Sequence, residues 1–391
     1  MKVALCADFQ RYDDIMINLD QNATMPLRPE ALRAMLPWLS GPVGNPASAH
    51  GAGRQARRAL EDARDMVAGL LDAFPEEVVF TSGATEANNL ALFGLAGDPP
   101  GIILASPIEH PCVVEPLKQL AGHGFTVMWL PVTAEGIVQD RAMKESNAPR
   151  LVTVMMANHE TGAIQPIAEL AASHPWALFH CDAAQAVGKI PVDFRALGVT
   201  SLSASGHKFG GPVGVGALLL KRGAKLRPLL FGGHQQQGRR PGTESVALAV
   251  GFAAALEAAV RELMAVAARL LALRQRLLAR LAEAAPVILN GPASGGLPQV
   301  LNLSFPGCRA DALLMALDLA GVHCSTGSAC SSGSLLPSPV LKAMGLPEES
   351  LRSAMRFSFG TGISEAEIDA AAGRIVTAVA RLRNAQKDEQ S

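Results

Sequence analysis

Short apolar runs alternate with amphipathic segments along the first half of the chain. The apolar runs are rich in branched residues and lie at 77–81 (EVVFT), 101–105 (GIILA), 151–157 (LVTVMMA), 177–183 (ALFHCDA) and 201–205 (SLSAS). Helical segments separate several of these runs, and two further helices are predicted at residues 29–40 and 52–74. Buried strands joined by helices are typical of a mostly parallel sheet with both faces covered. The pattern therefore predicts an α/β fold.

A long amphipathic segment at residues 256–284 is followed by a second region of strands and helices. This segment covers only about four heptads, which favours a helix between domains over a coiled coil. The runs VLNLSF and MRFSF predict strands in the second region, and Ser364 and Glu367 form the capping box of the last helix. A length of 391 residues is also typical of two domains.

Composition and charge exclude several classes of function. The chain is 49% hydrophobic and 18% charged with a net charge of −1, so we expect neither direct nucleic-acid binding nor attraction to an anionic membrane. No apolar run reaches the roughly 18 residues of a membrane-spanning helix, and the N-terminus lacks a signal-peptide core. The six cysteines form no CxxC pair, and we expect no metal site and a cytoplasmic location.

The segment SLSASGHKFGGPVGVGALLL places Lys208 between a strand and a glycine-rich turn. Small residues on both sides let a planar cofactor approach the backbone. A partly desolvated lysine loses its charge more readily and can form a Schiff base with an aldehyde. Taken alone, the segment is equally compatible with an ordinary turn lysine.

The segment ALFHCDAAQAVGK adds a second group suited to such a cofactor. Asp182 ends an apolar strand, where a carboxylate needs a partner to offset its burial. The protonated pyridine nitrogen of pyridoxal 5'-phosphate (PLP) is such a partner, and Gln185 could donate to the phenolate oxygen. The alternative is an aspartate that caps a helix.

The segment VVFTSGATEANNLAL has the strand–turn–helix order of a phosphate site. The N-terminus of a helix attracts an anion through its free N–H groups and its dipole. Gly83, Ala84 and Thr85 form this turn, and Ser205 and His207 could complete the phosphate cup.

Eight motifs together resemble the class V PLP enzymes of the cysteine desulfurase type, in the NifS/IscS-like branch. They are SGATEANNLAL, EHPCVVEP, MMANHETGAIQP, HCDAAQAVGK, SASGHKFGGPVG, GRRPGT, GSACSSGS and MRFSFG, in this order between about Leu19 and Leu382. The resemblance implies the fold type I architecture, with a mostly parallel seven-stranded sheet in the large domain and a smaller α+β domain. We expect the PLP-binding domain over residues 28–260, and the small domain with the cysteine loop over residues 1–27 and 261–391.

The resemblance also assigns residues to the cofactor. It implies that His110 stacks on the pyridine ring and moves protons, and that Thr243 reaches the phosphate of the neighbouring subunit in a homodimer. Asn158 and His159 correspond to a segment in which the family usually has two asparagines, the second of which contacts the phenolate oxygen. His159 departs from this pattern but could donate a hydrogen bond from a ring nitrogen.

For the substrate, the resemblance implies that Arg356 clamps the carboxylate and that Asn22 and Ala23 line the substrate site. A planar guanidinium suits this bidentate task better than an ammonium group. Cys330 lies among Ser, Gly and Ala, and the resemblance implies that its thiolate takes the sulfur as a persulfide. The catalytic residues are thus expected to be Lys208, Cys330 and His110.

The function implied is a PLP-dependent cysteine desulfurase, which converts L-cysteine to L-alanine and passes sulfur to an acceptor protein. Such an acceptor could be an iron–sulfur scaffold or part of tRNA thiolation. Two alternatives stay open. One is another class V PLP enzyme, such as an aminotransferase or a selenocysteine lyase. The other is a non-catalytic sulfur-delivery subunit with the same fold.

Overall fold

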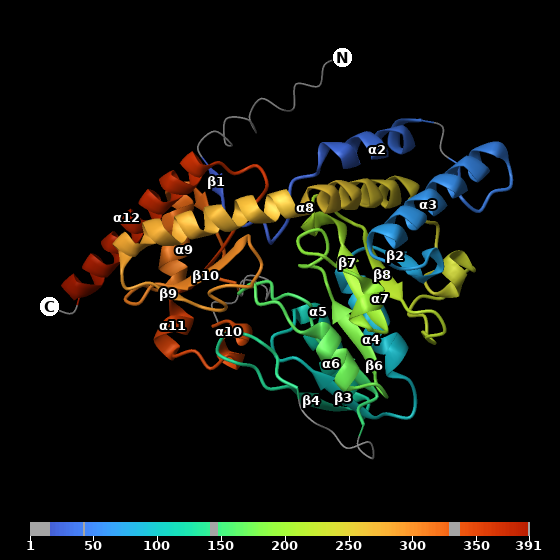
Figure 1. Cartoon of the computed structure of the whole chain (residues 1–391), viewed down its shortest axis with the longest axis horizontal. Coiled ribbons are helices and arrows are strands. Elements are labelled where there is room, and N and C mark those ends of the chain that lie inside the picture. The colour runs from blue at the N-terminus through green and yellow to red at the C-terminus, as the bar shows by residue number, and fades with distance from the viewer. Residues whose placement is uncertain (1–15, 42–43, 141–147, 328–336, 390–391) are drawn as a thin grey trace.

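A seven-stranded sheet forms the centre of the larger part of the molecule (Figure 1). The computed structural model describes residues 16–41, 44–140, 148–327 and 337–389. The strand order is β2-β8-β7-β6-β5-β3-β4, and only β8 runs antiparallel to its neighbours. The bounds are β2 (Val78–Thr81), β3 (Ile102–Ala105), β4 (Thr126–Trp129), β5 (Leu151–Thr153), β6 (Leu178–Asp182), β7 (Ser201–Ser205) and β8 (Gly216–Leu220). The predicted α/β class with a mostly parallel seven-stranded sheet is confirmed.

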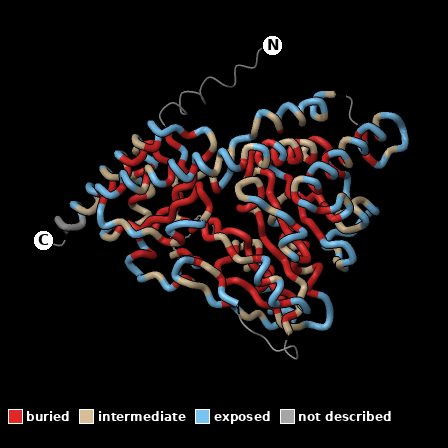
Figure 2. The backbone as a smooth tube through the Cα atoms, viewed as in Figure 1, coloured by how far each residue is buried: buried red, intermediate tan, exposed pale blue. Residues whose placement is uncertain are grey.

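Helices cover both faces of this sheet. One face packs on α4 (Ala84–Ala96) and α5 (Pro111–Gly122), through buried side chains such as Leu92 and Leu117. The other face packs on α3 (Gly51–Leu70), α6 (Ile167–Ser173) and α8 (Val246–Arg280). Figure 2 shows a buried centre in the larger part of the molecule, where the inner strands lie, whereas the edge strand β4 is only partly buried. Burial on both faces explains why apolar residues predominate in most of these strands.

A second hydrophobic core is built mainly from the C-terminal part of the chain. Its antiparallel sheet has the order β12-β10-β9, with β9 (Ile288–Leu289), β10 (Val300–Ser304) and β12 (Ala354–Ser358). The N-terminal strand β1 (Ile17–Asn18) pairs with β11 (Val322–His323). The helices of this part are α9 (Ala310–Leu319), α10 (Pro339–Ala343), α11 (Glu348–Arg352) and α12 (Glu365–Glu389).

Helix α8 contributes to both cores (Figure 1). It has 35 residues, which corresponds to a length of about 52 Å. Phe252 and Leu256 are buried in the first core, whereas Leu273 and Leu277 are buried in the second. Residue 260, where we expected the domains to divide, therefore lies inside a continuous helix, and the domain bounds stay a prediction.

Strand β2 lies at one edge of the sheet, where side chains form the backbone hydrogen bonds that a further strand would otherwise form. The amide of Gln236 accepts a hydrogen bond from the N–H of Phe80 at 2.6 Å and donates to its carbonyl at 2.8 Å. Arg64 donates to the carbonyl of Val78. Gln236 makes these contacts from a left-handed backbone conformation, with φ of 51°. In the described ranges, no helix is both long and apolar enough to span a membrane.

The strand register collects polar residues at one edge of the large sheet. Asp182 lies at the carboxyl end of β6 beside Ser203, and Ser205 ends β7 opposite Gly216. Thr81 ends β2 opposite the same glycine, immediately before the turn that leads into α4. In open α/β sheets, ligands bind at the carboxyl ends of the strands.

Candidate active site

A cavity of about 370 Å³ opens at this carboxyl edge. It is lined by side chains from the large sheet, from the N-terminal segment and from β12. Of the residues predicted from the sequence, it brings together Asn22, Ala23, Gly83, Ala84, Thr85, His110, His159, Asp182, Gln185, Ser205, His207, Lys208 and Arg356.

Lys208 lies in a short 3-10 turn, Gly206–Lys208, that follows β7 directly. Its Nζ donates to the carbonyl of Asn22 at 2.7 Å and to that of Ala23 at 3.0 Å. A Cβ on Gly211 would lie 2.9 Å from the carbonyl oxygen of Gly206, so the glycine permits the tight return of the chain. The lysine amine is thus held at the cavity wall.

Asp182 is buried at the end of β6 and is held by several donors. Its Oδ2 accepts from Asn88 Nδ2 at 2.7 Å, and its Oδ1 accepts from the N–H of Ala184 at 2.9 Å and from Ser203 Oγ at 3.3 Å. His180 Nε2 lies 2.9 Å from Asn88 Oδ1 and extends the network away from the cavity. No described helix begins at Asp182, so its interpretation as a helix cap is wrong.

The turn before α4 has the backbone of an anion site. Gly83 precedes the helix with φ of 157° and ψ of 178°, a conformation essentially restricted to glycine. The first N–H groups of the helix have no acceptors within it. Glu86 Oε2 accepts a hydrogen bond from the N–H of Ser82 at 2.8 Å, and Arg240 forms a salt bridge with the same carboxylate at 2.8 Å. The remaining N–H groups are suited to a phosphate.

Two histidines form another part of the wall. His110 caps α5 by accepting the N–H of Cys112 on Nδ1 at 3.2 Å, so a neutral ring carries its proton on Nε2. The rings of His110 and His159 meet edge to face, with centroids 5.4 Å apart. Burial lowers the pKa of both imidazoles, that of His159 most strongly because His110 and Arg356 add to the effect. Both are therefore neutral near pH 7.

Arg356 enters the cavity from β12 of the second core and is 3% exposed. It donates to Asp20 Oδ1 at 2.6 Å and to the carbonyl of His159 at 3.2 Å. Its Nε has no hydrogen-bond partner among the described residues. A buried guanidinium with a spare N–H group is suited to a carboxylate ligand.

Of the remaining predicted residues, the two that the structure describes lie apart from this cavity. Asn158 is buried behind it, where its amide donates to the carbonyl of Ile108 and accepts the N–H of Thr161. Thr243 is exposed on the surface. Cys330 lies outside the described residues.

The supporting contacts of the site were not predicted. Asn88, Ser203 and Arg240 each hold a predicted residue or the phosphate turn in place. Asn88 had a sequence signal, because it is the first of two consecutive asparagines before the apolar run LAL of a helix. The pairing of Arg240 with Glu86 joins residues 154 positions apart and had none.

The groups in this cavity fit PLP. Lys208 can hold its aldehyde carbon, Asp182 can pair with its pyridine nitrogen, and the turn before α4 can bind its phosphate. His159 lines the same cavity, and its buried Nδ1 has no hydrogen-bond partner in the part of the chain that the structure describes. Together these groups could hold the aldehyde, the pyridine nitrogen and the phosphate of the cofactor.

Comparisons with known proteins agree with this geometry. The class V aminotransferase profile matches residues 17–371. An IscS-like cysteine desulfurase from Mycobacterium tuberculosis is 44% identical over 385 residues, which are 95% of this chain and 98% of the relative. A solved NifS-like protein has a TM-score of 0.87 at 35% identity and covers 94% of this chain and all of its own.

A structure of SspA in complex with cysteine has a TM-score of 0.76 at 33% identity, over 88% of this chain and 98% of SspA. The chain therefore belongs to the class V aminotransferase family of PLP enzymes, in the branch of IscS- and NifS-like cysteine desulfurases.

Proposed function

We propose that this protein is a PLP-dependent cysteine desulfurase that moves the sulfur of L-cysteine to Cys330 and leaves L-alanine. The observation that carries the proposal is the convergence of Lys208, Asp182 and Arg356 on one cavity. The three come from separate segments of the chain and supply an amine, a carboxylate and a guanidinium. Each is suited to a different part of a cofactor–amino acid pair.

PLP, when bound, withdraws electrons from the α-carbon of an amino acid substrate. Asp182 keeps the pyridine nitrogen protonated, because its buried carboxylate is most stable beside a positive charge. Lys208 would hold the cofactor until the substrate amine takes its place there, and its freed Nζ would then accept the α-proton. Arg356 holds the substrate carboxylate, so the α-carbon stays in a fixed orientation during proton transfer.

Sulfur transfer requires a thiolate nucleophile. The Cys330 thiolate attacks the substrate sulfur and forms an S–S bond while the bond between Cβ and sulfur breaks. The electron pair goes to Cβ, which is then protonated to give alanine. His110, neutral and at the cavity wall, accepts a proton from the thiol or returns one to the product.

We also propose that the protein works as a homodimer. Helix α2 (Pro29–Ser40) exposes Leu32, Leu36 and Leu39 by 50–60%, and Phe231 is 86% exposed. Exposed apolar residues of this size are typical of a surface that another chain covers. We propose that Thr243 contacts the phosphate bound in the neighbouring subunit. We also propose that the reaction takes place in the cytoplasm and that the sulfur passes to an acceptor protein such as an iron–sulfur scaffold.

The test is alanine and sulfide formation from cysteine and a reductant, measured with the wild type, Cys330→Ala and Cys308→Ala. We expect equal amounts of alanine and sulfide from the wild type. Cys330→Ala should keep PLP and its absorbance near roughly 400 nm but lose sulfur transfer. Cys308 is buried in the second core, so Cys308→Ala should keep activity.

Other outcomes would favour the alternatives. Undiminished sulfur transfer by Cys330→Ala would refute the persulfide step. Amino-group transfer to a keto acid without sulfide would favour an aminotransferase, and faster turnover of selenocysteine alone would favour a selenocysteine lyase. A colourless, inert wild type would favour the non-catalytic subunit.

A further inference from the structure

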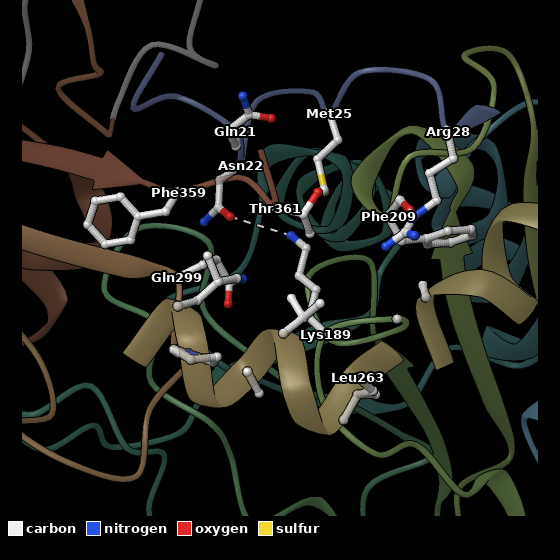
Figure 3. Close-up of a pocket in the computed structure, with 16 residues that line it drawn as sticks. Gln21, Asn22, Met25, Arg28, Lys189, Phe209, Leu263, Gln299, Phe359 and Thr361 are labelled. Carbon is white, nitrogen blue, oxygen red and sulfur yellow. Dashed lines mark hydrogen bonds between the residues drawn. The ribbon is translucent and has the colours of Figure 1, made fainter. Parts of the chain in front are cut away.

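Lys189 belongs to the motif HCDAAQAVGK but has no task in the proposed reaction. Figure 3 shows its side chain rising toward Asn22 through a small cavity beside Phe209 and Leu263 of α8. This cavity has a volume of about 30 Å³, which is room for about one water molecule. The contacts of the Lys189 amine indicate a different role.

The amine of Lys189 is shared between two side-chain amides. Its Nζ donates to Asn22 Oδ1 at 3.4 Å and to Gln185 Oε1. In the part of the chain that the structure describes, no carboxylate lies within salt-bridge distance of this Nζ. Burial, Lys208 and Arg356 lower the pKa of the amine well below its ordinary value. Both its charged and its neutral forms carry the two N–H groups that these contacts use.

Both amides present their oxygens to Lys189. The charged amine has no lone pair, so turning either amide over would set its N–H₂ group against the N–H groups of Lys189. The neutral amine has a single lone pair, which can accept from only one of the two amides. With their oxygens held by Lys189, the amides present their nitrogens to other groups. Gln185 Nε2 donates to the carbonyl of Asn22 at 3.1 Å, and Asn22 Nδ2 donates to the carbonyl of His159 at 3.1 Å.

The carbonyl of Asn22 links Lys189 to Lys208 through hydrogen bonds. It accepts Gln185 Nε2 and also Lys208 Nζ, which lies at 2.7 Å. Asn22 and Gln185 both line the main cavity, whereas Lys189 lies behind them. The amine of Lys189, which lies behind Asn22 and Gln185, thus determines which of their amide atoms face a ligand in the main cavity.

We propose that Lys189 is a positioning residue that turns the N–H₂ group of Gln185 toward the cofactor site and holds the segment of Asn22 against Lys208. The proposal rests on the proposed function only in taking the ligand to be PLP. Lys189 touches neither the cofactor nor the substrate. Its effect passes through two amide groups whose oxygens it keeps away from the cavity.

The test compares PLP binding by the apoenzymes of the wild type, Lys189→Met and Lys225→Met. Methionine keeps an apolar stem and removes the N–H groups, and Lys225 is an exposed lysine that serves as the control. We expect Lys189→Met to bind PLP about tenfold more weakly, the loss of roughly one hydrogen bond, with a shifted visible band. Lys225→Met should match the wild type in both. Wild-type affinity and spectrum for Lys189→Met would overturn the proposal.

A double-mutant cycle separates positioning from general destabilisation. If Lys189 acts through Gln185, the double variant Lys189→Met with Gln185→Met should bind PLP little more weakly than either single variant. Additive losses would overturn the proposal. Thermal unfolding of each apoenzyme, with PLP absent, shows whether folding has changed.

Gln185→Glu gives a second test that does not depend on the folding of Lys189→Met. It keeps an oxygen toward Lys189 but removes the N–H₂ donor, so we expect a similar tenfold weakening. Unchanged PLP affinity in this variant would contradict the proposed orientation. These readouts need no turnover, so a wild type that binds PLP but forms no alanine would refute the desulfurase alone.

Discussion

Glu160 is a buried carboxyl group that joins segments far apart in the sequence. Its Oε2 accepts from Ser338 Oγ at 2.6 Å, and its Oε1 lies 3.6 Å from His159 Nε2. A Cβ on Gly327 would lie 2.5 Å from Oε2, so the chain passes close to the carboxyl group there. Burial raises the pKa of Glu160 to about 7, although Ser338 and Arg356 lower it in part. This carboxyl group therefore ionises near neutral pH.

The raised pKa predicts how Glu160→Gln changes stability with pH. Because the folded-state pKa of about 7 exceeds the ordinary 4.5, Glu160 stabilises the fold most fully below pH 4.5, and this contribution is lost as pH rises to about 7. Glutamine does not titrate. The free energy of unfolding of Glu160→Gln, relative to wild type, should therefore increase by a few kcal/mol between about pH 4.5 and 7.

Chemical denaturation of the apoenzymes at several pH values measures this difference. Glu349→Gln, at an exposed position, is the control and should track the wild type. A difference between Glu160→Gln and wild type that stays constant from pH 4.5 to 8 would show that Glu160 does not titrate in this range.

The sequence predicted which residue types line the site better than it predicted their partners. Asp182 ends one strand and Lys208 follows another, and the carboxyl ends of both strands must share one edge of the sheet, so their proximity could be predicted. Asn158 and His159 are neighbours in sequence, yet only His159 lines the cavity. That choice depends on a turn in which Asn158 Oδ1 accepts two N–H groups, and no motif specifies it.

The predicted elements were accurate wherever periodicity was strong. The helix at 29–40 and the strand at 201–205 match α2 and β7. The prediction for α8 began at residue 256, whereas the helix begins at Val246, because the stretch VALAVGFAAA is apolar on all sides and lacks an amphipathic period. Strand β8 was not predicted; it runs antiparallel to β7 and follows the turn after Lys208.

A substitution in the turn between β2 and α4 should change PLP affinity as well as the stability of the fold, whereas a comparable substitution elsewhere should change stability alone. Gly83→Ala and Gly198→Ala both place a side chain at a positive φ, 157° and 69°, and each should destabilise the fold by about 1–3 kcal/mol. Only Gly83 precedes the helix N–H groups that are suited to the phosphate. We therefore expect PLP affinity to fall about tenfold or more in Gly83→Ala alone.

Thermal unfolding and PLP titration of the two apoenzymes check this expectation. The space around each glycine is open, so the change acts through the backbone and not through a clash. Equal PLP affinities in the two variants would place the phosphate elsewhere.

For the whole molecule, the proposed dimer predicts complementation between two defective chains. If Thr243 serves the neighbouring site, a dimer of Lys208→Ala with Thr243→Ala contains one site with both residues intact. Random pairing of equal amounts of the two chains should restore about a quarter of the wild-type activity. Each variant alone should be inactive or bind PLP weakly.

Co-expression of the two variants with different affinity tags, followed by purification of the mixed dimer, gives the measurement. The mixed dimer alone should have about half of the wild-type activity, because one of its two sites is complete. No recovery in a purified mixed dimer would mean that Thr243 acts within its own chain. A monomeric wild type would contradict the dimer itself.

The hydrogen bonds of Gln236 and Arg64 to the backbone of strand β2 bear on the tendency of the chain to associate with other copies. An open strand edge can recruit strands from other copies, which leads to aggregation. Here one carboxamide, that of Gln236, occupies both hydrogen-bonding groups of Phe80, and Arg64 occupies the carbonyl of Val78. Gln236 and Arg64 thus occupy hydrogen-bonding groups at the β2 edge of the sheet, which should oppose the addition of a strand from another copy of the chain.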